Sequence, residues 1–255
     1  MKKGDRGQVT AFIIFALIIV GIIAGYYIFK SENLKLISSE KRINPEIQPI
    51  YNYVENCIKE TGEDAIEIIG LAGGYYQIPE LSIDLGIPYY MHEKIDYTPS
   101  KEKIEEQISF YINDNLNDCI NNFENFPDFL VNSDNVITKT IIEDEKVVLD
   151  LDYRLSVKKG ENSYLIEKFN SEIPVRFGVV YDVARNIVAN EIKDGKYICI
   201  DCVDYFSEKY DLKVNLFSYN ENDVIFTIID ENSEINSKDF VFNFVNKYEQ
   251  IEVGI

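Results

Sequence analysis

Two cysteines separated by two residues form the motif of this chain that is best suited to chemistry. Cys199 and Cys202 lie in the stretch KYICIDCVDYF. At this spacing one thiolate can attack a partner's disulfide while the second thiol resolves the mixed disulfide. Asp201 and Asp204 disfavour a thiolate, so the sequence favours a structural bridge that links the end of a strand to the next short helix. The alternatives are a redox-active pair and half of a zinc site, for which no second CxxC supplies the remaining ligands.

The other two cysteines, Cys57 and Cys119, each lie on the apolar face of a predicted helix. Two antiparallel neighbouring helices can bring them to the Cα separation of about 5.5–6 Å that a disulfide requires. Such a bridge closes a loop of about 60 residues and contributes about 4 kcal/mol in the chain-entropy model. The alternative is two buried free cysteines that pack as small apolar groups. An even number of cysteines favours disulfides in an oxidising compartment.

A single histidine, His92, limits the classes of enzyme that the chain can represent. A serine or cysteine hydrolase would depend on it as the base, and no G-x-S-x-G motif accompanies it. One histidine excludes an HExxH zinc site. The acidic stretch NDNLND at residues 113–118 falls in a predicted helix and lacks the glycine of an EF-hand loop. We therefore predict no catalytic residue, no metal and no cofactor.

The region after the first predicted helix is rich in glycine, proline and tyrosine. Its stretch GLAGGYY lacks the Lys-Ser/Thr ending of a phosphate-binding loop and is expected to end the helix. Tyrosine provides a large contact area at a low entropic cost, so the region is a candidate recognition surface for an extracytoplasmic protein partner. The alternative is that these side chains cover the helical layer as core and rim. The candidates are Tyr75, Tyr76, Tyr89, Tyr90 and Tyr97.

An uncharged apolar segment at residues 9–29 is predicted to anchor the chain in a membrane. About 20 helical residues span the hydrocarbon core, whereas a cleavable secretion signal has about 7–15 apolar residues and a small-residue cleavage site. This segment is longer and ends in GYYIFK. Lys2, Lys3 and Arg6 precede it, so the positive-inside rule places the N-terminus in the cytoplasm and residues 31–255 outside the cell.

The stretch RGQVTAF, a short basic leader followed by Gly-Gln and an apolar helix, resembles the class III signal peptide of archaeal type IV pilin-like proteins. The resemblance implies cleavage between Gly7 and Gln8. Pilins carry a glutamate five residues into the mature helix, where this chain has Phe12. The resemblance therefore favours processing more than assembly into a filament. The whole chain also resembles single-pass surface proteins from small archaeal genomes.

The negative charge of the chain disfavours binding to a nucleic acid. The sequence has 25 basic and 44 acidic residues. Four of the basic residues and one acid lie in the first thirty positions, so residues 31–255 carry a net charge of about −22. Such a surface repels phosphates. The sequence thus predicts a cell-surface protein that binds or scaffolds, with a processed pilin-like subunit and an anchored thiol oxidoreductase as alternatives.

The periodicity of the apolar residues predicts an α+β fold. Helical spacing runs from about Ile50 to Ile69 and from Pro99 to Phe123, with Thr98 as the expected cap of the second helix. Residues 147–157 alternate as a half-buried strand. A return strand (165–177), a helix (179–195) and three strands (212–248) are predicted to follow.

The predicted architecture is an N-terminal transmembrane helix, a membrane-proximal helical layer, and a C-terminal antiparallel sheet with a packed helix. The expected parts are residues 1–30, which hold the cytoplasmic tip and the anchor, the helical part at 31–130, and the β-rich part at 131–255. Residues 31–255 as one domain are the alternative.

Overall fold

The computed structural model describes residues 43–194 and 198–249, and the structural statements below concern these residues. From Glu46 onward they belong to one folded unit. In chain order the elements are α2 (Gln48–Leu71), β1 (Tyr89–His92), β2 (Ile95–Asp96), α3 (Lys101–Ile120), η1 (Asn121–Phe123), β3 (Leu130–Ser133), β4 (Ile137–Ile142), β5 (Lys146–Lys159), β6 (Asn162–Pro174), α4 (Phe177–Glu191), η2 (Ile192–Asp194), α5 (Ile200–Tyr210), β7 (Lys213–Ser218), β8 (Asp223–Ile235) and β9 (Lys238–Lys247).

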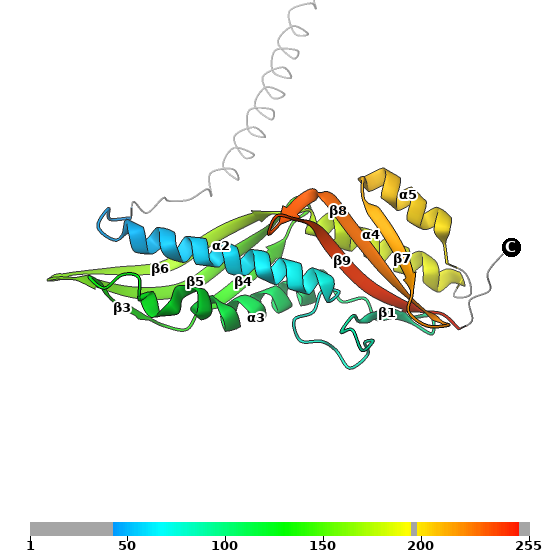
Figure 1. Cartoon of the computed structure of the whole chain (residues 1–255), viewed down its shortest axis with the longest axis horizontal. Helices are drawn as coiled ribbons and strands as arrows, with labels where there is room; N and C mark the ends of the chain where they lie inside the picture. Colours follow the sequence, from blue (N-terminus) through cyan, green and yellow to red (C-terminus); the bar gives the residue numbers. More distant parts are fainter. Residues whose placement is uncertain (1–42, 195–197, 250–255) are drawn as a thin grey trace, which may run out of the picture. The chain divides into compact units, whose positions relative to one another are not determined.

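The strands form two sheets rather than the single antiparallel sheet predicted from the sequence. One sheet has the order β2-β1-β9-β8-β7, in which β1 runs parallel to β9 and the other pairs are antiparallel. In the other sheet, β5 pairs with β6 along one edge and with β4 and then β3 along the other (Figure 1). The prediction was wrong here because the alternating patterns of β5, β6 and β7 to β9 show which face each strand buries and not which strands pair.

Helix α2 packs against strands of both sheets, and a glycine marks each close approach. A Cβ atom on Gly62 would lie 2.6 Å from Leu149 Cδ1 in the β5–β6 sheet. A Cβ atom on Gly70, two turns later, would lie 2.5 Å from the carbonyl oxygen of Val241 in β9. The absent side chains therefore let one helix approach both sheets closely.

Helix α3 covers the outer edge of β4 with polar side chains. Backbone amides of Thr138, Thr140 and Ile142 donate hydrogen bonds to three side chains of α3 at 2.9, 3.1 and 2.8 Å. The acceptors are Asn113 Oδ1, Ser109 Oγ and Glu105 Oε1, respectively. The acceptors lie four residues apart on the helix, a rise of about 6 Å, and the donors lie two residues apart on the strand, a rise of about 6.7 Å. The two spacings are similar enough for three successive hydrogen bonds to form. The helix thereby occupies donors that would otherwise be free at a sheet edge.

Phenylalanine side chains from β8 and β9 form the core of the five-stranded sheet. Phe226 and Phe244 are direct cross-strand partners and stack with ring centroids 4.9 Å apart. Tyr90 of β1 stacks on Phe244 at 5.0 Å, and Phe177 of α4 contacts Phe240 at the same centroid distance. Helix α4 is thus attached to the sheet through aromatic contacts, which fixes the place where its C-terminal end lies.

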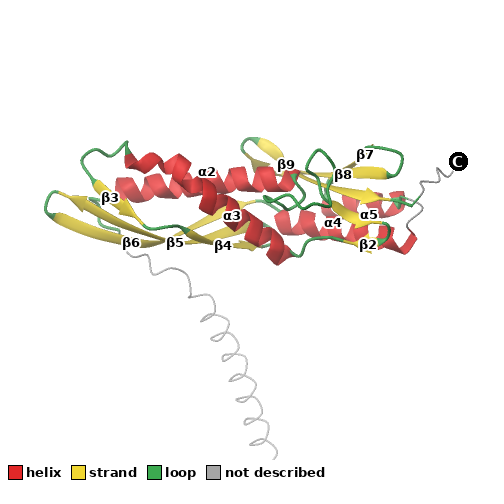
Figure 2. Ribbon diagram, turned by 90° about the horizontal axis from the view of Figure 1, so that it is seen from below, coloured by secondary structure: helices red, strands yellow, loops and turns green. Residues whose placement is uncertain are grey.

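Several predictions from periodicity are confirmed. The two predicted helices correspond to α2 and α3, which run antiparallel and side by side (Figure 2). The cap of α3 is Ser100 rather than Thr98, and its hydroxyl accepts from the Lys103 amide at 3.2 Å. The strand at 147–157, its partner, the helix after it and the three last strands are present as β5, β6, α4, β7, β8 and β9.

The predicted anchor at residues 9–29 and the predicted cleavage site at Gly7 and Gln8 lie outside the described residues. Between residues 43 and 249, where the chain is described, no helix is long and apolar enough to cross a membrane.

Candidate functional site at the start of helix α5

Both disulfides expected from the sequence are present, and they differ in what they connect. Cys57 and Cys119 join α2 to the end of α3, with a Cα separation of 5.6 Å and a sequence separation of 62. The Tyr53 hydroxyl donates to the Cys119 carbonyl at 2.9 Å next to this bridge. The bridge therefore links α2 covalently to α3.

The second bridge, Cys199–Cys202, lies entirely in the first turn of α5. The Cα atoms are 5.2 Å apart, and Cys199 is the residue that caps the helix. Its carbonyl accepts from the amides of Cys202 and Val203, both at 3.1 Å. The interpretation of this pair as a link between a strand end and a helix is therefore wrong, because both sulfurs belong to one helical turn. Both cysteines are half-buried, so the bridge is accessible from solvent.

A buried carboxyl group lies beneath this turn. Glu191, the last residue of α4, is 1 % exposed. One of its carboxyl oxygens accepts from the Cys199 amide at 2.9 Å, and the other accepts from the Tyr248 hydroxyl, also at 2.9 Å. Burial raises the pKa of Glu191 above its ordinary value, although the two hydrogen bonds act in the opposite direction. Glu191 thus ties the start of α5 to the end of β9.

Tyr248 completes this buried group. Burial is the main cause that raises its pKa well above the ordinary range, and the neighbouring Glu191 carboxyl adds to the effect. The adjacent Asn246 is fully buried, and neither polar atom of its side chain has a hydrogen-bond partner among the described residues. The interior below the cysteine pair is therefore unusually polar for a protein core.

The sequence analysis missed Glu191, although a signal for it exists. On α4, Ala184, Ile187, Val188 and Glu191 lie at the i, i+3, i+4 and i+7 positions of one buried face. A single acid that continues an apolar stripe is expected to be buried, and a buried acid requires hydrogen-bond donors. The identity of those donors, the Cys199 amide and the Tyr248 hydroxyl, depends on the fold.

The five tyrosines predicted as a recognition surface differ in their burial, and one of them lies in the core. Tyr90 is fully buried, and its hydroxyl donates to the Gly73 carbonyl at 3.0 Å. Its place in that prediction is wrong, because β1 pairs with β9 and turns this side chain into the core. The half-buried Tyr89 donates to Asp223 Oδ2 at 2.8 Å, and Tyr76 packs edge-on against Tyr111.

Tyr75 is half-buried, and only Tyr97 of the five is exposed, at 43 %. His92 lies between Tyr89 and Tyr97, with ring centroids at 5.2 and 6.4 Å. In the described part of the chain, no group of three or more His, Cys, Asp or Glu side chains is placed to hold a metal ion.

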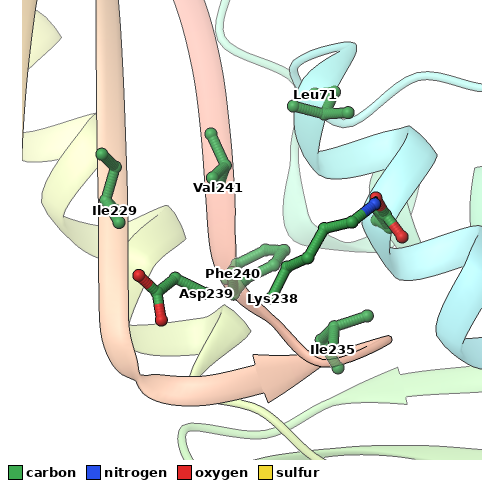
Figure 3. Close-up of a pocket in the computed structure, with 8 residues that line it drawn as sticks. Leu71, Ile229, Ile235, Lys238, Asp239, Phe240 and Val241 are labelled. Atoms are coloured by element: carbon green, nitrogen blue, oxygen red, sulfur yellow. The ribbon is translucent and has the colours of Figure 1, made fainter.

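A mainly apolar groove of about 370 Å³ separates the end of α2 from the bend between β8 and β9 (Figure 3). Lys238 crosses its rim and forms an ion pair with Glu67 Oε1 at 2.6 Å. Hydrogen bonds from Lys238 and then Asn236 lower the pKa of Glu67. The lining residues are Glu67, Leu71, Ile229, Ile235, Lys238, Asp239, Phe240 and Val241.

Comparison with known proteins adds no relative: no protein-family model, no curated protein and no solved structure matches the chain. Function must therefore be inferred from the residues themselves.

Proposed function

We propose that this chain is a single-pass membrane protein whose acidic, disulfide-braced domain lies outside the cytoplasm and binds or scaffolds other proteins at the cell surface. The observation that carries the proposal is the Cys57–Cys119 bridge between two helices. A bridge of this kind is stable in an oxidising compartment and rare in a reducing cytosol. The apolar segment at 9–29 and the basic residues before it give the same orientation.

The segment that follows α2 is the best candidate for the binding surface. It contains several large apolar side chains that are exposed, in place of the tyrosine surface expected from the sequence. Leu85 is 65 % exposed and Ile95 is 55 % exposed. Ile78 is also exposed and lies near Gly86, next to Leu85 in the chain. Exposed apolar side chains that are close together are typical of protein–protein contacts.

The orientation is tested on intact cells that express the full chain with one epitope tag at each end. An external protease is expected to remove the C-terminal tag and to leave the N-terminal tag intact until the cells are lysed. Protection of both tags in intact cells would contradict the proposed orientation. The same cells, lysed with an alkylating agent and no reductant, should yield Cys57 and Cys119 as a linked peptide pair.

Binding is tested by photo-crosslinking in intact cells. A photoreactive residue at position 85 is expected to give discrete adducts, whereas the same residue at position 152 is the matched control. Asp152 is exposed on the polar face of β5, away from the apolar segment. Adducts of equal yield from both positions, or from neither, would contradict a recognition surface at residues 78–95.

A pilin-like subunit cleaved after Gly7 is the second candidate, because the leader RGQVTAF resembles a class III signal peptide. The intact mass of the protein extracted from membranes decides between the two candidates. A chain that begins at Gln8 supports processing, whereas a chain that retains its first seven residues, or lacks Met1 alone, contradicts it.

A further inference from the structure

We propose that Cys199 and Cys202 form an exchangeable disulfide that oxidises dithiols of a partner protein, with Cys199 as the sulfur that is attacked. This activity goes beyond binding or scaffolding and does not rest on the proposed binding surface. It rests on four features of the described structure: the small loop that the bridge closes, its place at a helix N-terminus, the support beneath it, and the surface around it.

The small loop means that this bridge contributes less to the stability of the fold than the Cys57–Cys119 bridge does. Only three positions separate its cysteines in the chain, against 62 for the Cys57–Cys119 bridge. The stabilisation by a disulfide grows with the length of the loop that it closes. The first turn of α5 is also closed without the bridge, by the hydrogen bonds from the Cys202 and Val203 amides to the Cys199 carbonyl. Opening the bridge therefore leaves the turn in place.

The helix N-terminus favours the reduced form of Cys199. Cys199 occupies the N-cap position of α5, and the positive end of the helix dipole there stabilises a negative charge. A cysteine thiolate at a helix start is more stable and more reactive than a free thiol. The exposed Asp201 and Asp204 act in the opposite direction, but solvent and salt screen their charges. The sequence predicted a short helix after the motif but placed Cys199 at the end of a strand, whereas the structure places it as the helix cap.

The support beneath the pair keeps the two sulfurs in position during exchange. The buried Glu191 carboxyl accepts from the Cys199 amide, and the Tyr248 hydroxyl donates to the same carboxyl. Val203, the buried residue of α5, packs into the core one position after Cys202. The backbone of the motif is thus held from below, while Cys199 and Cys202 are half-buried residues.

The surface around the pair suits a partner polypeptide. Ile200 lies between the cysteines and is 51 % exposed, and Tyr205 on the next turn is 56 % exposed. Exposed apolar side chains next to a reactive disulfide provide contacts for an extended or partly folded chain. Such contacts favour a protein dithiol over a small thiol.

The exchange proceeds in two balanced steps. A thiolate of the partner attacks the Cys199 sulfur, the Cys199–Cys202 bond breaks, and Cys202 leaves with the bonding electron pair and takes up a proton. The second thiol of the partner, as its thiolate, then attacks the partner sulfur of the mixed disulfide and releases the Cys199 thiolate. The partner dithiol loses two electrons and two protons. The cysteine pair gains both electrons and one proton, which leaves Cys199 as a thiolate, and the second proton passes to solvent.

The first experiment compares the two bridges in one molecule. The full-length protein in detergent is equilibrated with mixtures of reduced and oxidised dithiothreitol, quenched with acid and alkylated, and its peptides are weighed. We expect Cys199 and Cys202 to become reduced at a ratio of reduced to oxidised dithiothreitol at least tenfold lower than Cys57 and Cys119. A tenfold ratio corresponds to about 30 mV. Reduction of both bridges at the same ratio would overturn the proposal.

The second experiment assigns the attacked sulfur. With oxidised glutathione as the probe, the Cys202→Ser variant should form a mixed disulfide at Cys199 at least tenfold faster than Cys199→Ser forms one at Cys202. Equal rates would overturn the assignment.

A third variant, Asp201→Asn, keeps both cysteines and removes a charge next to them. Reduced Asp201→Asn is expected to react with oxidised glutathione two- to fivefold faster than the wild type, whereas Glu208→Gln, two turns further along α5, should react at the wild-type rate. An equal rate in Asp201→Asn and Glu208→Gln would contradict a Cys199 thiolate whose stability depends on the charges at the start of α5.

Discussion

Arg176 and Asp230 form a two-point ion pair in the interior of the β8 region. Arg176 Nε donates to Asp230 Oδ2 at 3.0 Å, and a second guanidinium nitrogen donates to the other carboxylate oxygen. Asp230 is fully buried, and the remaining Arg176 donors reach the carbonyls of Tyr210 and Asp211 at 3.0 and 3.2 Å. This pair ties the chain just before α4 to the bulge in β8 and to the end of α5.

Removing the arginine should therefore unfold the protein more easily. Arg176→Ala leaves the Asp230 carboxylate buried without its cation, and we expect the free energy of unfolding to fall by about 3–5 kcal/mol. Arg154→Ala is the matched control, because Arg154 and Glu167 form an exposed pair at 3.5 Å worth about 0–1 kcal/mol. Urea titrations of both variants at pH 7 measure the difference, and equal losses would contradict it.

The polar contacts between α3 and β4 predict that removing the Ser109 hydroxyl group lowers the stability of the protein. Ser109 Oγ accepts from the Thr140 amide and lies 2.9 Å from Thr140 Oγ1. Ser109→Ala leaves this buried amide unpaired, so stability should fall by about 1–3 kcal/mol. Exchange of the Thr140 amide with deuterium should accelerate most among the β4 amides. The control Ser163→Ala, on an exposed end of β6, should change stability by less than about 0.5 kcal/mol.

The two disulfides should differ in their contribution to stability. Replacing Cys57 and Cys119 together by serine removes a constraint on a long loop and should lower the free energy of unfolding by about 4 kcal/mol. The same change at Cys199 and Cys202 removes a four-residue loop, for which the same relation gives about 2 kcal/mol. Denaturant midpoints of the two double variants provide the comparison. A larger loss for the Cys199 and Cys202 variant would contradict the assignment of Cys57–Cys119 as the structural brace.

Glu191 should make stability depend on pH in the acidic range. Its pKa is raised in the folded state, so between 4.5 and this raised value the unfolded chain has released a proton that the folded chain retains. Its contribution to stability therefore falls as the pH rises through this range. Glutamine does not titrate, so Glu191→Gln does not lose stability in this way. The free energy of unfolding of Glu191→Gln relative to the wild type should therefore increase from pH 4 to pH 7. Glu208→Gln, on the exposed side of α5, corrects for the lost charge, and an identical trend in both variants would contradict the expectation.

The two glycines of α2 should respond differently to alanine. A Cβ on Gly62 meets the flexible ends of Leu149 and Ile173, whereas a Cβ on Gly70 meets the Val241 carbonyl in the backbone of β9. Side-chain ends can shift and a paired strand cannot, so Gly70→Ala should cost about 1–3 kcal/mol and Gly62→Ala less. Both substitutions add the same helix propensity, so thermal unfolding of the two variants isolates the packing effect. An equal cost would contradict the close approach of α2 to β9.

The sequence by itself determined the elements that have long and regular patterns. The helical spacing of α2 and α3, and the strict alternation of β5 with its buried Val147, Leu149 and Leu151, follow from which face each element buries. It also favoured the disulfide between Cys57 and Cys119, because both residues were predicted on apolar helix faces, and the structure confirms this bridge.

Only the tertiary structure decided which segments meet. The pairing of β1 with β9, the burial of Tyr90, and the contact of Glu191 with the Cys199 amide all join segments whose local patterns carry no mark of their partners. The position of Cys199 as the N-cap residue of α5, rather than at the end of a strand, also depends on this packing. Periodicity records the face that an element buries, whereas the partner on that face is chosen by the packing of the whole chain.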